Sequence, residues 1–315
     1  MVEDSQSPPP VLLEGVTKAF HGHLGIGRHV AVDGLSLRVE RAEIFGLVGP
    51  NGAGKTTTLK MMLGLLRADR GDLRLFGRRP SDPVARRRIG FLPENPYFYD
   101  YLNAEEFLDF YGRLKGMERE RRRDAVRDGL ARVGLARHAR TALRKFSKGM
   151  TQRLGLAQAI LDEPDLLILD EPMSGLDPLG RREVRDLILS MRAAGRTVLF
   201  SSHILQDAEM ICDRVAILHA GKLRSVGRLD DLVSRNVRWY EVGIRGEVPR
   251  TPGVERLSSS GPETLVRVPD VDALTRLLAA VRESGGRVLS VWPYRETLED
   301  LFLKEVERRG TEGGR

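Results

Sequence analysis

Short apolar runs alternate with segments of helical period from Val11 to about Leu232. The clearest runs occupy residues 44–48, 166–169, 197–200 and 215–218, and each is bounded by turn or polar residues. Uncharged runs of this length are typical of strands buried on both faces of a parallel sheet. The pattern therefore predicts one α/β domain over residues 11–235 with a largely parallel sheet.

The apolar pattern changes to a helical period inside this domain, which predicts a helical insert at about 95–165. Asn103, followed by Glu106 three residues later, has the spacing of a capping box that opens a helix. Apolar side chains then recur at helical spacing, and we expect them to form a buried stripe. They are Phe107, Phe110, Tyr111 and Leu114.

A second, smaller α+β domain is expected at 236–306. Strands are predicted near 237–244, 264–268 and 288–292, and a helix at 271–284 has one apolar face. Thr297 and Asp300 stand at the spacing of a second capping box, which predicts a final helix. The ends of the chain, 1–10 and 307–315, are expected to be flexible.

Composition and charge limit the partners and the cellular location that we expect for the protein. The 315 residues carry 51 Lys and Arg against 44 Asp and Glu, for a net charge of +7, with the two signs well mixed. The basic balance favours anionic surroundings without choosing among nucleotide, membrane headgroups and nucleic acid. Cys212 is alone in an apolar stretch, which indicates a buried thiol. The chain shows no secretory signal and no apolar run long enough to span a bilayer, so another chain must cross any membrane involved.

The strongest chemical motif follows the first buried strand. Residues 49–56 read Gly-Pro-Asn-Gly-Ala-Gly-Lys-Thr and should lead from the strand into a helix. Glycines let backbone N–H groups converge on phosphate oxygens, the lysine reaches the terminal phosphates, and the hydroxyl of Thr56 can ligate Mg²⁺. This pattern predicts a nucleoside triphosphate site with ATP and Mg²⁺ as cofactors. Its candidate binding residues are Gly49, Asn51, Gly52, Ala53, Gly54, Lys55, Thr56 and Thr57.

Two adjacent carboxylates end the second buried strand, at the edge where open α/β sheets place their ligands. Asp170 is the candidate Mg²⁺ ligand. Glu171 is the candidate general base, because a carboxylate there can polarise a water that attacks the γ-phosphate. The alternative, an acidic strand end that merely faces solvent, is disfavoured by the phosphate-binding loop.

Residues 146–153, Phe-Ser-Lys-Gly-Met-Thr-Gln-Arg, resemble the signature motif of ABC ATPases, whose consensus is LSGGQ. The match is partial, since Ser147 and Gly149 agree with the consensus while Phe146, Lys148 and Met150 depart from it. The order of the motifs, with this one between the phosphate-binding loop and the acidic strand, makes the resemblance specific. In this family the serine and glycine contact the γ-phosphate of a nucleotide held by the opposite subunit.

Further positions resemble other parts of the ABC ATPase site. Asp177 closes a Ser-Gly-Leu-Asp stretch similar to the family's D-loop and is a further candidate nucleotide-binding residue. His203 resembles the family's switch histidine, which contacts the γ-phosphate and orients the attacking water. Phe20 resembles the aromatic residue that stacks on adenine, although core packing explains it almost as well. Glu94 stands where the family usually has a glutamine that contacts Mg²⁺, so a negative charge is added beside the metal.

The resemblance covers about residues 11–232 and is closest to ATPases of bacterial exporters. It implies a P-loop ATPase core with a helical subdomain, and ATP hydrolysis in a head-to-tail dimer, taken as a homodimer. It further implies a separate transmembrane permease as partner and a cytoplasmic position at the inner face of the membrane. The aromatic stretch 97–101 is the candidate docking groove for the permease, with local packing as an equal alternative.

Two other classes of function fit the sequence less well. A soluble ABC ATPase that acts on ribosomes or nucleic acid would commonly carry two nucleotide domains or a long coiled coil, and neither is visible in the sequence. No nucleic-acid partner is therefore expected. A regulator that binds ATP without turnover is disfavoured because both Glu171 and His203 are present.

Overall fold

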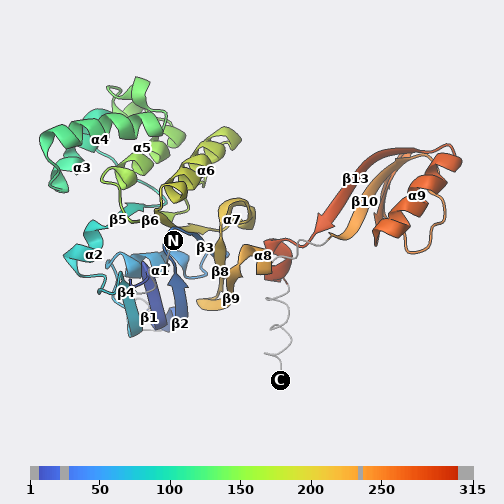
Figure 1. Cartoon of the computed structure of the whole chain (residues 1–315), viewed down its shortest axis with the longest axis horizontal. Coiled ribbons are helices and arrows are strands. Elements are labelled where there is room, and N and C mark those ends of the chain that lie inside the picture. The colour runs from blue at the N-terminus through green and yellow to red at the C-terminus, as the bar shows by residue number, and fades with distance from the viewer. Residues whose placement is uncertain (1–6, 22–27, 233–236, 304–315) are drawn as a thin grey trace. The chain divides into compact units, whose positions relative to one another are not determined.

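The computed structural model describes residues 7–21, 28–232 and 237–303, and they form two compact units, Met1–Leu229 and Asp230–Arg315 (Figure 1). The predicted flexible end 307–315 lies outside the described residues. Residues 1–6 of the other predicted flexible end lie outside them too. Of the remainder, Pro10 is buried and its carbonyl accepts a hydrogen bond from the Phe76 backbone N–H.

The first unit contains a six-stranded sheet with the order β5-β6-β7-β3-β8-β9. Its first five strands are parallel, and β9 pairs antiparallel with β8. All four predicted core strands are confirmed, and every residue of β3, β6 and β7 is buried. The strands are β3 (Ile44–Val48), β5 (Ile89–Leu92), β6 (Leu166–Asp170), β7 (Thr197–Ser202), β8 (Arg214–His219) and β9 (Lys222–Arg228).

A second sheet in this unit, with the order β2-β1-β4, is antiparallel and was not predicted. Helix α1 (Lys55–Met62) contacts β2, β4 and β6, so it lies between the two sheets. Buried side chains of both sheets and of α1 form one continuous core. The strands of this sheet are β1 (Val11–His21), β2 (Arg28–Val39) and β4 (Arg70–Leu75).

The helical insert is present and gathers on the opposite side of the six-stranded sheet from β1, β2 and β4 (Figure 1). The capping box of its first helix is confirmed in both directions between Asn103 and Glu106. The predicted buried stripe is only partly correct. Phe107 is fully buried, but Phe110 is 39% and Leu114 67% exposed, so the buried face of α3 is narrower than the predicted stripe. The helices are α3 (Ala104–Leu114), α4 (Arg119–Arg132) and α5 (Lys148–Ile160).

The remaining helices of the first unit are short or flank the six-stranded sheet. Helix α6 begins after Asp177, whose side chain accepts a hydrogen bond from the Gly180 backbone N–H, and it packs on β7 and β3. These elements are α2 (Pro83–Arg87), α6 (Pro178–Ala193) and α7 (Leu205–Ile211), with 3₁₀ turns η2 (Ala136–His138) and η3 (Leu143–Lys145). No helix in the described ranges is long and apolar enough to cross a membrane.

The second unit is a four-stranded antiparallel sheet with the order β11-β12-β10-β13 and one helix, which agrees with the predicted α+β pattern. Helix α9 buries Ala273, Leu277 and Val281 against the sheet. The predicted capping box at Thr297 is confirmed, since Thr297 and Asp300 exchange hydrogen bonds. The elements of this unit are α8 (Leu229–Leu232), which bridges the boundary, β10 (Val237–Arg245), β11 (Glu255–Ser260), β12 (Glu263–Val268), α9 (Val271–Glu283) and β13 (Arg287–Arg295).

Candidate functional site

The turn between β3 and α1 brings the phosphate-binding loop against the rest of the core. Gly49 has φ 153° and a side-chain carbon there would lie 2.2 Å from the Leu218 carbonyl oxygen. Gly54 has φ 101°, and a side-chain carbon there would meet the Ala31 carbonyl oxygen at 2.4 Å. Both positions therefore require glycine for backbone shape and for close packing. As predicted, α1 begins at Lys55 directly after the loop.

Lys55 is 6% exposed and its ammonium group is held inside the loop. Its Nζ donates to the Gly49 carbonyl oxygen at 2.7 Å and lies 3.3 Å from Glu171 Oε1. The carbonyl and carboxylate oxygens around Nζ offset part of the hydration that the ammonium group loses on burial. Lys55, the predicted phosphate-binding lysine, therefore forms an ion pair with Glu171, the predicted general base.

The two acidic residues at the end of β6 are positioned by one buried hydroxyl that the sequence did not reveal. Ser201, on β7, is fully buried, and its Oγ donates to Asp170 Oδ1 at 2.6 Å. The same Oγ accepts the Glu171 backbone N–H at 2.9 Å. Glu171 has φ 49°, an unusual value for a residue with a side chain, and such conformations persist where surrounding bonds hold them.

Glu171 also meets the predicted switch histidine. His203 follows β7, and its Nδ1 lies 2.8 Å from Glu171 Oε2, while its backbone N–H donates to the same oxygen at 3.3 Å. The Glu171 side chain thus lies between the Lys55 ammonium and the His203 ring. This arrangement fixes the direction in which the carboxylate faces the pocket.

Residues 51–57 of the predicted site line a pocket of about 430 Å³, whereas Gly49 and Asp170 are not among its lining residues. Phe20 is 39% exposed at this pocket, which argues against core packing as its role. Glu94 and Ser174 also line it, and so do His29 and Ala31, which the sequence analysis missed. The full lining is Phe20, His29, Ala31, Asn51, Gly52, Ala53, Gly54, Lys55, Thr56, Thr57, Glu94, Glu171, Ser174 and His203.

The donor set at this pocket fits a divalent cation of the Mg²⁺ type. The Thr56 hydroxyl donates to Asp170 Oδ1 at 3.3 Å, so a hydroxyl and a carboxylate converge, and Glu94 lines the same pocket. The described residues hold no cluster of three or more His, Cys, Asp or Glu that could bind a metal alone. Mg²⁺ commonly takes one or two protein oxygens and completes its shell with water and phosphate.

The signature residues lie elsewhere. Ser147, Gly149 and Asp177 line a different pocket of about 200 Å³, which shares no lining residue with the first. Ser147 caps α5, where its Oγ accepts the Met150 backbone N–H at 3.3 Å, and Asp177 caps α6. Two helix N-termini therefore open on this second pocket, and such termini attract anions.

Comparison with known proteins agrees with this geometry. Residues 32–174 match the family model described as ABC transporter. An ABC transporter ATP-binding protein of Synechocystis sp. is 42% identical over 278 residues, which cover 88% of this chain and 78% of the relative. The chain belongs to the ABC transporter ATP-binding proteins. It is an ATP-binding subunit that hydrolyses ATP, and the expected P-loop ATPase core of the ABC type is confirmed.

Two further similarities bear on cargo and assembly. The bacitracin transport ATP-binding protein of Bacillus licheniformis is 36% identical, over 89% of this chain and 94% of that protein. A solved dimer of an ATP-binding cassette in a post-hydrolysis state, bound to ADP and phosphate, is 25% identical with a TM-score of 0.64. It covers 70% of this chain and 98% of that one.

Proposed function

We propose that this protein is the ATPase of an export system, in which two copies bind head to tail and drive a separate transmembrane permease. The observation that carries the proposal is the separation of the two predicted halves of the ATP site. The phosphate-binding loop with Glu171 lines one pocket, while Ser147 and Gly149 line another. A nucleotide held by the loop of one copy meets a signature motif only if a second copy supplies it.

Within each shared site the residues take distinct roles. Backbone N–H groups of the loop and the Lys55 ammonium bind the β- and γ-phosphates, and Phe20 stacks on the base. Thr56 and Asp170 would hold Mg²⁺, and Glu94 lines the nucleotide pocket beside them. When bound, the ion would neutralise charge on the phosphate oxygens.

Glu171 accepts a proton from the attacking water, and His203 orients that carboxylate and the γ-phosphate. Ser147 and Gly149 of the second copy donate to the γ-phosphate from the start of α5. Asp177 of each copy, at the start of α6, belongs to the contact between the copies. The site is complete only in the closed dimer. Hydrolysis of the shared ATP removes the γ-phosphate that both copies contact, so the dimer returns to its open state.

The dimer is tested by specific ATPase activity measured over a dilution series, with the oligomeric state recorded at each concentration. A shared site predicts that monomers bind ATP yet hydrolyse it poorly, so specific activity falls as dimers dissociate. Constant specific activity in a demonstrated monomer would contradict the shared site.

An exposed aromatic patch supports a permease as partner. Tyr97, Tyr99 and Tyr101 are 88%, 46% and 77% exposed, and Tyr99 also contacts the ring of Phe110. Only Phe98 of this stretch turns inward, against Phe107. The stretch follows Glu94 of the nucleotide pocket directly, so a partner bound here is placed to sense nucleotide. Exposed aromatic residues are enriched at protein interfaces.

Export is the transport direction that the relatives favour, since a Nod factor export ATP-binding protein of Ralstonia nicotianae is 33% identical over 96% of this chain and 95% of that protein. The partner is identified by purifying the full-length protein from its own membranes. We expect a polytopic membrane protein to co-purify, and the double change Tyr97→Ser with Tyr101→Ser to remove it. Val271→Ser, at a 58% exposed apolar position of the second unit, serves as control. Co-purification of ribosomes instead would favour the alternative function.

A further inference from the structure

A large pocket of the first unit lies away from the nucleotide site. It has a volume of about 590 Å³ and shares no lining residue with the pocket at the phosphate-binding loop. Its walls come from the end of α1, the segment leading into β4, and the segment before α2. The lining residues are Met61, Gly64, Leu66, Arg67, Ala68, Asp69, Arg70, Gly71, Asp72, Leu73, Arg79, Pro80 and Ser81.

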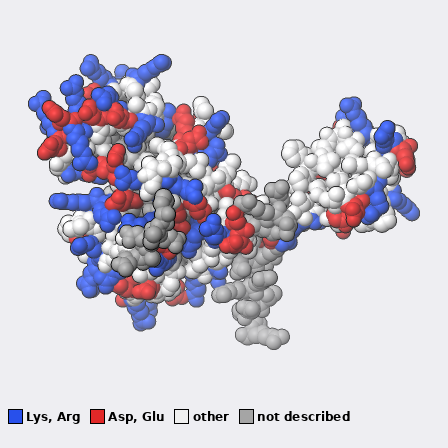
Figure 2. Space-filling model, viewed as in Figure 1, with Lys and Arg blue, Asp and Glu red and all other residues white. Residues whose placement is uncertain are grey.

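Three arginines dominate the charge of this pocket. Arg67, Arg70 and Arg79 are exposed, and within the described part of the chain no hydrogen bond or ion pair engages their guanidinium groups. Figure 2 shows Lys and Arg side chains along the edge of the first unit where Figure 1 places β4 and α2. The pocket therefore offers three positively charged groups that are free to bind an anion.

The two carboxylates of the lining do not cancel this charge, because each already has a cation outside the lining. Asp69 Oδ1 lies 2.7 Å from Lys18 Nζ, and its Oδ2 accepts the Ala19 backbone N–H at 2.7 Å. The hydrogen bond from Lys18 lowers the pKa of Asp69, so this carboxylate stays ionised and paired. Asp72 Oδ2 lies 2.6 Å from Arg74 Nε.

The base of the pocket is apolar. Met61 and Leu73 are buried there, and Leu66 and Ala68 are partly buried and pack against the main core. A planar guanidinium matches two phosphate oxygens at once, and arginine is therefore favoured over lysine where phosphate is bound. An apolar pocket floor beneath three guanidinium groups suits a phosphate-bearing ligand that also has an apolar part.

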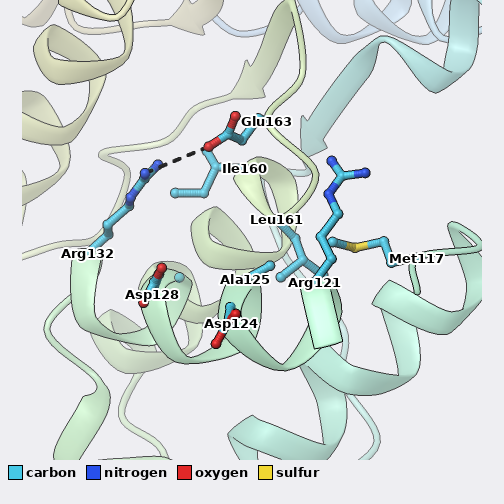
Figure 3. A pocket seen from close by; sticks show the side chains of 10 residues that line it. Met117, Arg121, Asp124, Ala125, Asp128, Arg132, Ile160, Leu161 and Glu163 are labelled. Carbon is cyan, nitrogen blue, oxygen red and sulfur yellow. Dashed lines mark ion pairs between the residues drawn. The ribbon is translucent and has the colours of Figure 1, made fainter. Parts of the chain in front are cut away.

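The pocket on the helical insert shows the opposite arrangement (Figure 3). It is lined by charges of both signs, and its arginines are paired: Arg121 with Asp162 at 2.8 Å and Arg132 with Glu163 at 4.0 Å. Asp124 and Asp128 project from the same helix, α4, beside them. Two arginines of this lining stand against three carboxylates, so the pocket has no excess of positive charge and provides a matched control.

We propose that Arg67, Arg70 and Arg79 form a second anion site, which binds a phosphate-bearing molecule outside the nucleotide pocket. The ligand class is a phosphate ester with an apolar portion, either an anionic lipid headgroup or a soluble phosphate ester. This inference does not rest on export or on dimerisation, because the pocket is built within one copy of the first unit.

The test compares the full-length protein with the triple variant Arg67→Gln, Arg70→Gln, Arg79→Gln. A control removes the same charge from α4 by Arg121→Gln, Arg127→Gln and Arg132→Gln. Binding is measured with vesicles of phosphatidylglycerol and phosphatidylcholine, with vesicles of phosphatidylcholine alone, with phenyl phosphate as a soluble ester that has an apolar part, and with polyglutamate. A non-hydrolysable ATP analogue with Mg²⁺ saturates the nucleotide pocket throughout.

We expect the first variant to bind its phosphate ligand on the order of 100-fold more weakly, at about fivefold per arginine, while the control stays within about threefold. Loss confined to phosphatidylglycerol vesicles identifies a lipid headgroup, and loss with phenyl phosphate identifies a soluble ester. Basal ATPase activity should be unchanged in the first variant, which shows that it folds and separates this test from the proposed function.

Three outcomes would overturn the inference. The first is an absence of binding to either phosphate ligand by the unmodified protein. The second is an equal loss of phosphate binding in both triple variants, which would show that the loss depends on net charge and not on this pocket. The third is binding of polyglutamate as tightly as the phosphate ligands, which would indicate an acidic protein segment as the occupant.

Discussion

Ser201 is the residue whose removal most directly tests how the two carboxylates are positioned. Ser201→Ala removes a fully buried hydroxyl that donates to Asp170 Oδ1 at 2.6 Å and accepts the Glu171 N–H at 2.9 Å. A hydrogen bond to a charged group contributes about 2 kcal/mol, and a buried N–H left without a partner costs about 1 kcal/mol. We therefore expect the free energy of unfolding of the first unit to fall by about 3 kcal/mol.

Activity should fall further than stability explains, because the proton acceptor is no longer held in place. Misplacement of a reacting group by about 1 Å costs up to roughly 100-fold in rate, so we expect ATPase activity about 10- to 100-fold lower at temperatures where the variant stays folded. In the Ser201→Ala variant the Asp170 carboxylate loses its hydrogen bond from Ser201 and retains the 3.3 Å hydrogen bond from the Thr56 hydroxyl.

The assay must separate the two units. Both tryptophans, Trp239 and Trp292, belong to the second unit, so tryptophan fluorescence reports that unit while far-UV circular dichroism follows the helices of the first. Ser190→Ala is the control, since Ser190 is exposed and bonds only within α6, and its effect should stay within about 0.5 kcal/mol. A loss below about 1 kcal/mol for Ser201→Ala with unchanged ATPase activity would refute this reasoning.

Substitutions at Gly49 and Glu94, and the reactivity of Cys212, test three separate features of the first unit. Gly49→Ala should weaken ATP binding by at least about tenfold in a titration, because the added carbon would lie 2.2 Å from the Leu218 carbonyl oxygen; unchanged affinity would contradict the packing argument. Glu94→Gln should retain Mg-ATP binding, and near-complete loss of binding would show that the added carboxylate is an essential ligand. Burial raises the pKa of the Cys212 thiol, so at mildly alkaline pH it should react with a thiol reagent about 100-fold more slowly in the folded protein than in the denatured one. Equal rates would show that the thiol is accessible.

Much of the core fold could be predicted, because buried parallel strands leave a clear signal. The apolar run 44–48 coincides with β3, and the other core runs fall inside β6, β7 and β8. The antiparallel sheet of β1, β2 and β4 was missed for a physical reason. Register shifts interrupt the pairing of β1 with both neighbours, so its inward and outward positions do not alternate regularly. Strand β11 was missed because all six of its residues are exposed.

The candidate site divides in the same way. The sequence predicts the loop glycines, Lys55, Asp170 and Glu171, because each of these motifs stands at or directly after the end of an apolar run that forms a buried strand. Ser201 was not, since a single serine at a strand end gives no pattern, and only the pairing of β6 with β7 brings it beside Asp170. His29 and Ala31 reach the nucleotide pocket from β2. The contribution of His29 and Ala31 could not be predicted from the sequence, because the antiparallel sheet that contains β2 was itself not predicted.

The shared site is tested most directly by mixing two inactive variants. Lys55→Ala removes the loop lysine and leaves the signature motif intact, whereas Ser147→Ala does the reverse. A mixed dimer contains one site with both halves intact, so an equal mixture should recover up to about one quarter of the unmodified activity, far above the sum of the two variants. Activity no greater than that sum, in a mixture shown to contain mixed dimers, would contradict a site built from two copies.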